Sequence, residues 1–232
     1  MSSSRMAADR PALVVPAYFH PAVRSTDWQR LAARAQQVRL VVLNIASGAG
    51  ERPDNAFLPA LSRLRDAGVT VAGYVDTSYG CRPLSAALVE FERYQEWYDV
   101  HDVFFDRVST AAEHVDRYRT FADSARRHGA DTVAFNHGAH PVEAYAEHAD
   151  MLGTFEGPWQ AYLDAVVPRW VRASPARKFF HLVHSVPHRH LGDALDLARK
   201  RNAGGAYATN QAGDNPWDHV PGDPPDPETA HS

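Results

Sequence analysis

The chain has 232 residues, of which 44% are hydrophobic and 22% are charged, so it can bury a full globular core. Its 24 basic and 28 acidic residues give a net charge of -4, which argues against a nucleic-acid partner, since such proteins favour a basic patch. The single cysteine, Cys81, excludes an internal disulfide and a cysteine-based zinc site.

The beginning of the chain lacks the pattern of a signal peptide. Its first apolar stretch, which ends at Tyr18, is short and is broken by Pro16. No apolar run approaches the length of a transmembrane helix. We therefore expect a soluble, cytoplasmic protein without a membrane partner, or a secreted one if the true N-terminus is missing.

Eight short apolar runs follow one another along the chain, and nearly all of them end in a polar residue. The runs are 13–15 leading to Tyr18 and His20, 40–43 before Asn44, 69–75 before Asp76, 102–105 before Asp106, 132–135 before Asn136, 151–155 before Glu156, 179–183 before His184, and 205–208 before Thr209 and Asn210. In a parallel barrel of eight strands, the active site lies at the C-terminal ends of the strands. The pattern therefore predicts a fold and a candidate site together.

Helical patterns separate these runs. Apolar residues recur at helical spacing, or helix-start signals occur, in the segments 28–38, 57–64, 84–98, 111–128, 141–148, 158–167 and 187–201. Alternating strands and helices indicate parallel strands joined by right-handed crossovers. Eight repeats favour an α/β fold of one TIM-like (β/α)8 barrel, although an open sheet remains possible if one or two runs are loops.

We expect the barrel to occupy residues 11–210 as one domain. Residues 1–10 are predicted to be a flexible N-terminal tail. Residues 211–232 are rich in Pro and Asp and are predicted to be a C-terminal tail, because that composition does not form a core. Trp217 is the one residue of this tail that we expect can pack back onto the barrel.

Three carboxylates lie at predicted strand ends: Asp76, Asp106 and Glu156. Paired carboxylates suit glycoside hydrolysis, in which one acid protonates the leaving oxygen and the other attacks or activates water. Asp is also a strong helix N-cap, so Asp76 has an equally good structural explanation. Glu is a poor cap, which favours a functional role for Glu156.

Polar and aromatic residues at the same strand ends are candidates for substrate binding, because sugar rings stack on aromatic side chains. They are Tyr18, His20, Asn44, Asp76, Tyr79, Arg107, Asn136, Trp159 and His184. The 13 histidines include His137-x-x-His140 and a group from His181 to His190, but they do not follow strand ends in a ligand pattern. We therefore expect neither a metal site nor a cofactor.

Several stretches together resemble spherulation-specific family 4, the spherulin-4-like proteins. The likeness rests on residues 16–21, 42–44, 46–50, 73–80, 97–98 and 104–106, and it runs in order as far as Trp159. The resemblance implies a TIM-like barrel related to glycoside hydrolases that cut α-1,4-linked galactosamine or N-acetylgalactosamine polymers. It also implies an Asp-Glu pair at the end of the fourth strand and a further Glu on a later strand. Asp106 matches the first of these and Glu156 the last, while Arg107 stands in place of the middle acid.

Two functions follow as hypotheses, with a metal-dependent hydrolase as a weaker third. The first is a hydrolase of amino-sugar glycans, with Glu156 as the acid and Asp106 as nucleophile, base or transition-state stabiliser. Arg107 would then hold an anionic substituent, or would orient Asp106 and favour its charged form. The second is a non-catalytic carbohydrate-binding barrel, which the absence of the middle acid favours.

Overall fold

The computed structural model describes residues 10–220, and its strands close into one parallel barrel. Each strand pairs with the next along the chain, and the eighth pairs with the first. The strands are β1 (Ala12–Ala17), β2 (Val38–Leu43), β3 (Val71–Asp76), β4 (Asp102–Asp106), β5 (Val133–Asn136), β6 (Met151–Pro158), β7 (Phe179–His184) and β8 (Gly205–Ala208). The predicted (β/α)8 barrel is thus confirmed, and all eight apolar runs form strands.

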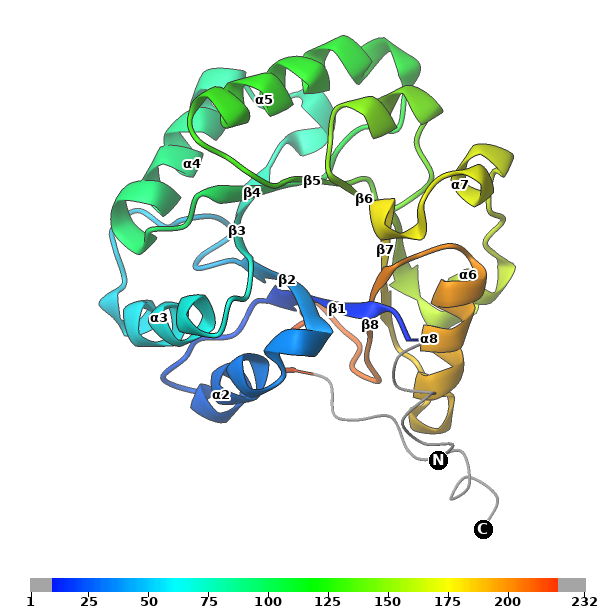
Figure 1. Cartoon of the computed structure of the whole chain (residues 1–232), viewed down its shortest axis with the longest axis horizontal. Helices are drawn as coiled ribbons and strands as arrows, with labels where there is room; N and C mark the ends of the chain where they lie inside the picture. The colour runs from blue at the N-terminus through cyan, green and yellow to red at the C-terminus, as the bar shows by residue number, and fades with distance from the viewer. Residues whose placement is uncertain (1–9, 221–232) are drawn as a thin grey trace.

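Helices surround this ring of strands (Figure 1). They are α2 (Ser25–Ala33), α3 (Leu58–Asp66), α4 (Leu84–Tyr98), α5 (Val115–Arg127), α6 (Trp159–Asp164), α7 (Arg169–Ala173) and α8 (Leu191–Lys200). The helix expected over 141–148 is wrong, because the structure has there a 3₁₀ segment, Glu143–Glu147. The expected start of α6 also shifts, because β6 extends through Pro158. Among residues 10–220, no helix combines the length and apolar character that crossing a bilayer requires.

Aromatic rings fill the inside of the barrel below its mouth. Tyr74 stacks on Phe104 at 6.5 Å between ring centroids, and Phe104 packs against Phe180 at 5.8 Å. All three side chains are buried. The interior is therefore a packed core, as expected for this fold, and the polar side chains gather above it.

The outer face of β3 is pressed closely against α4. The ring of Tyr94 lies so close to Gly73 that a Cβ added to the glycine would come within 2.5 Å of it, and the Tyr94 hydroxyl donates to the Leu43 carbonyl at 2.9 Å. We expect Gly73→Ala to lower the free energy of unfolding by about 1–3 kcal/mol, because the buried ring must move. Urea denaturation measures this change.

Gly192→Ala is the matched control for that substitution. Gly192 lies in α8 and an added Cβ meets nothing within 4 Å, so alanine should be neutral or slightly stabilising there. Equal stability of the Gly73 variant and the natural chain would contradict the close packing of α4 on β3.

The residues after β8 do not leave the barrel at once. Trp217 and Val220 are buried, and the Trp217 ring packs on His184 at 5.8 Å and on Tyr207 at 5.4 Å. Asn215 donates to the Tyr18 carbonyl. The segment 211–220, expected to be part of a tail, therefore packs over the ends of β1, β7 and β8, and Trp217 packs back as expected. Residues 1–9 and 221–232 of the expected tails lie outside the described residues.

Candidate functional site

Two carboxylates meet at the mouth of the barrel through one amide. The Nδ2 group of Asn136, at the end of β5, donates to Asp106 Oδ1 at 2.8 Å and to Glu156 Oε2 at 2.5 Å. The hydroxyl of Tyr74 donates to the other oxygen of Asp106 at 2.9 Å. Neighbouring strands β3, β4, β5 and β6 thus bring four polar groups to one point, three of them predicted from strand ends.

A bulge in β6 turns Glu156 toward this point. The pairing with β7 moves from Gly153 with Phe180 directly to Phe155 with His181, so one residue of β6 is extra. Gly153 faces the interior, where an added Cβ would meet Asn136 and Phe180. Strict alternation would then point Phe155 inward and Glu156 outward, but the bulge reverses them. Phe155 instead packs on Tyr162 of α6, at 4.5 Å between centroids.

Burial raises the pKa of both acids above their ordinary values. Burial, and secondarily the charge of Asp106, raise the pKa of Glu156 from 4.5 to about 7. Burial also raises the pKa of Asp106, while its hydrogen bonds from Tyr74 and Asn136 oppose that rise. Near neutral pH, Glu156 can therefore hold a proton.

Tyr18 and Tyr74 complete the wall beside the acids. Their rings meet edge to face at 5.5 Å, and burial raises the pKa of both hydroxyls, so both stay protonated. The charges of Asp106 and Glu156 add to the rise in the pKa of Tyr18. Tyr74 is a site residue that the sequence analysis missed. Its position, two residues before Asp76 on one strand face, is the signal that could have found it.

The guanidinium of Arg107 bonds to Asp76 and not to Asp106, contrary to one of its two expected roles. Its Nη1 donates to Asp76 Oδ2 at 2.9 Å, and its guanidinium lies 5.0 Å from the centroid of the Tyr79 ring. Asp76 also caps the following turn, because its Oδ1 accepts from the Ser78 amide at 2.6 Å. Asp76 therefore makes the local turn bond that its structural explanation expects, and it also pairs with Arg107.

Three other candidates make contacts away from the acids. His20 Nε2 lies 2.9 Å from Asp54 Oδ2, and Asn44 Oδ1 accepts from the Gly48 amide in the β2–α3 connection. Trp159 stacks on His190 at 6.0 Å. These contacts join loops and helices to one another. None of the three residues has a described contact with Asp106 or Glu156. His184, the last residue of β7, packs its ring against Trp217.

The remaining histidines are spread over separate environments. His181 lies outside the strand ring, bonded to the Tyr162 hydroxyl at 2.7 Å, and burial lowers its pKa to about 3. The His137 Nδ1 faces the Ser109 carbonyl at 2.9 Å, and burial lowers its pKa to about 4. Within residues 10–220, no three His, Cys, Asp or Glu side chains are grouped so that they could hold a metal ion.

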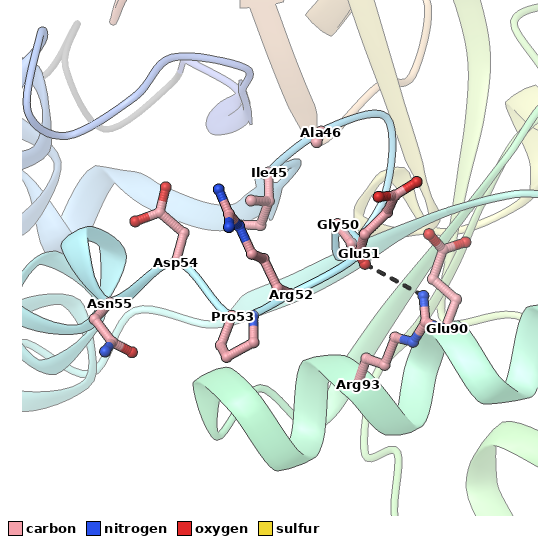
Figure 2. A pocket seen from close by; sticks show the side chains of 10 residues that line it. All are labelled: Ile45, Ala46, Gly50, Glu51, Arg52, Pro53, Asp54, Asn55, Glu90 and Arg93. Atoms are coloured by element: carbon pink, nitrogen blue, oxygen red, sulfur yellow. Dashed lines mark hydrogen bonds between the residues drawn. The ribbon is translucent and has the colours of Figure 1, made fainter.

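A hollow of about 820 Å³ lies between the β2–α3 connection and α4 (Figure 2). Arg93 of α4 crosses its edge and donates to the Gly50 carbonyl at 3.2 Å. Charged side chains of both signs line the hollow, and Asp106 and Glu156 are not among them. The hollow is therefore separate from the carboxylate pair.

Solved structures with similar folds are TIM-like barrels. Aspergillus clavatus Sph3, solved in complex with GalNAc, superposes with a TM-score of 0.76 at 24% identity, covering 92% of this chain and 94% of that one. Deoxyribose phosphate aldolase from Aeropyrum pernix reaches 0.53 at 16% identity, covering 90% and 89%. At these identities the likeness shows the fold alone.

Sequence comparison gives the family. Spherulin-4 of Physarum polycephalum is 26% identical over 186 residues, which are 75% of this chain and 55% of that protein, so this chain spans about half the length of that relative. The model of spherulation-specific family 4 matches residues 12–224, almost the whole barrel and the segment that packs over it. The chain therefore belongs to spherulation-specific family 4, as its motifs had suggested.

Proposed function

We propose that this protein is a glycoside hydrolase that cleaves glycans containing α-1,4-linked galactosamine or N-acetylgalactosamine. The observation that carries the proposal is the Asn136 amide, which holds Asp106 and Glu156 together at the barrel mouth. Acid-assisted glycoside cleavage uses two carboxyl groups, one of which holds a proton to donate, and the raised pKa of Glu156 suits that role. The GalNAc bound to the similarly folded Sph3 supports an amino sugar as the ligand.

Glu156 is the proton donor in this proposal. Its pKa of about 7 keeps the carboxyl protonated in weakly acidic solution, so it can deliver a proton to the glycosidic oxygen as the C–O bond breaks. Asp106, held by Tyr74 and Asn136, forms a bond to the anomeric carbon or stabilises its positive charge. Water then completes the reaction, with Glu156 taking its proton back from that water.

The spacing of the acids favours retention of anomeric configuration. The two oxygens that share the Asn136 amide cannot be farther apart than the two bonds together, about 5.3 Å, which fits the short separation of retaining enzymes and not the longer inverting one. Asp106 is therefore better placed to act as a nucleophile than to activate a water between itself and the sugar.

The test uses the purified chain and defined α-1,4-linked oligomers of N-acetylgalactosamine and of galactosamine. Binding is measured by calorimetry, and cleavage by the appearance of new reducing ends with the anomer followed by NMR. We expect both binding and cleavage, with the first product in the α configuration. Failure to bind either oligomer would overturn the proposal.

A non-catalytic carbohydrate-binding barrel is the second candidate. It is favoured by Arg107, which stands where the family resemblance implies a further acid, and by the nearby exposed Tyr79, which can stack on a sugar ring. Binding without cleavage of any oligomer would select this function.

A further inference from the structure

Arg107, Asp76 and Tyr79 form a compact cluster beside the carboxylate pair. The guanidinium donates to Asp76 from one edge and covers the Tyr79 ring with one face. Side-chain exposure is 47% for Arg107 and 26% for Asp76, and Tyr79 is 54% exposed, so the cluster is open to a ligand. A carboxylate, a guanidinium and an aromatic face are groups that bind sugar hydroxyls and the apolar face of a sugar ring.

The backbone holds this cluster in an unfavourable conformation. Ser78, Tyr79 and Arg107 have φ values of 48°, 55° and 51°, in the left-handed region that residues other than glycine rarely adopt. Hydrogen bonds join the two turns: the Tyr79 amide donates to the Arg107 carbonyl at 2.7 Å, and the Thr77 hydroxyl donates to the same oxygen at 2.9 Å. Strain of this kind concentrates at functional sites, which supports a role in binding.

Arg107 also changes the charge that a ligand meets at the mouth. Asp76 pairs with Asp106 across the neighbouring strands β3 and β4, and its charge contributes to the raised pKa of Asp106. Arg107 offsets that charge from 2.9 Å away. Arg82, the other cation beside Asp76, is bonded to Glu90 and to the Asp76 carbonyl. Arg107 is thus the group that keeps the mouth from carrying the uncompensated charge of Asp76.

We infer that Arg107 determines specificity: it makes this site select an uncharged, N-acylated amino sugar over a protonated one. An ammonium group would be attracted by Asp76 and Asp106 and repelled by Arg107, whereas an N-acetyl group carries no charge and can accept a hydrogen bond from the guanidinium. This inference rests on the proposed function, since it names the form of the sugar that the same site takes.

The test compares Arg107→Gln, Arg107→Glu and Arg107→Lys with the natural chain. Dissociation constants are measured for N-acetylgalactosamine oligomers and for fully deacetylated oligomers of equal length, at low and high salt. We expect the natural chain to prefer the acetylated oligomer. Arg107→Glu should move the ratio of the two constants at least about tenfold toward the deacetylated oligomer, with Gln between and Lys close to the natural chain. High salt should shrink the shift.

Arg119→Gln is the control, because Arg119 is also half exposed and paired with an aspartate, Asp116, but lies on α5. Thermal unfolding of every variant shows whether the barrel is intact. A ratio that does not change in Arg107→Glu, or a natural chain that prefers the deacetylated oligomer, would overturn this inference and leave the proposed function standing. Absence of binding to either oligomer by the natural chain would overturn both.

Discussion

Asp106→Asn and Glu156→Gln should each lower glycan turnover at least about a hundredfold and leave glycan binding largely intact, since positioned acid–base catalysis contributes that much. Both substitutions keep the size of the side chain and a carbonyl oxygen that can accept from Asn136. What they remove is the charge of Asp106 or the transferable proton of Glu156. Initial rates of reducing-end release, measured beside dissociation constants, separate the two effects.

Asp102→Asn is the matched control for these variants. Asp102 lies on the same strand as Asp106 but at its opposite end, where its carboxylate accepts from the Thr132 amide at 2.5 Å. It should leave turnover per folded molecule unchanged. Normal cleavage by both Asp106→Asn and Glu156→Gln would show that the working pair is chosen wrongly.

The strand order could be predicted because each strand of this barrel is a short apolar run with its own polar ending. The conformation of the connection between β5 and β6 could not be predicted. Residues 141–148 carry a weak helical pattern, and tertiary contacts decide which conformation they adopt. The hydroxyl of Tyr145 donates to the Ala111 carbonyl at 2.9 Å, and its buried ring packs on Tyr118. A tight 3₁₀ turn satisfies these contacts over a segment too short for a full helix.

The site was predictable to the extent that strand ends define a barrel mouth. Asp106, Asn136 and Glu156 do meet there. Glu156 points to the mouth only because of the bulge in β6, which no residue pattern predicts. The ion-pair partner of Arg107 could not be predicted either. Adjacency in the sequence suggested Asp106, whereas a left-handed backbone turn at Arg107 directs its side chain to Asp76. Trp217 contacts His184 only because the segment after β8 folds back, a long-range effect of packing.

Glu156 should also make the stability of the protein depend on pH. In the unfolded chain its carboxyl loses its proton near its ordinary pKa of 4.5, whereas in the folded chain it holds the proton up to about 7. Between these values the unfolded state is ionised and the folded state is not, so the free energy of unfolding falls as pH rises. The difference between these two pKa values corresponds to about 3 kcal/mol of stability, which is lost in full above pH 7.

Glu156→Gln removes this titration, so the variant should be more stable than the natural chain by up to about 3 kcal/mol at pH 8 and equally stable near pH 4.5. Urea denaturation at both values measures the difference, and Glu143→Gln, an exposed site in the β5–β6 connection, should show no such change. A pH-independent difference would contradict the raised pKa. The expected result is a more stable variant at pH 8 that has lost its turnover. It would mean that burial of Glu156 lowers the stability of the protein but keeps the carboxyl protonated for catalysis.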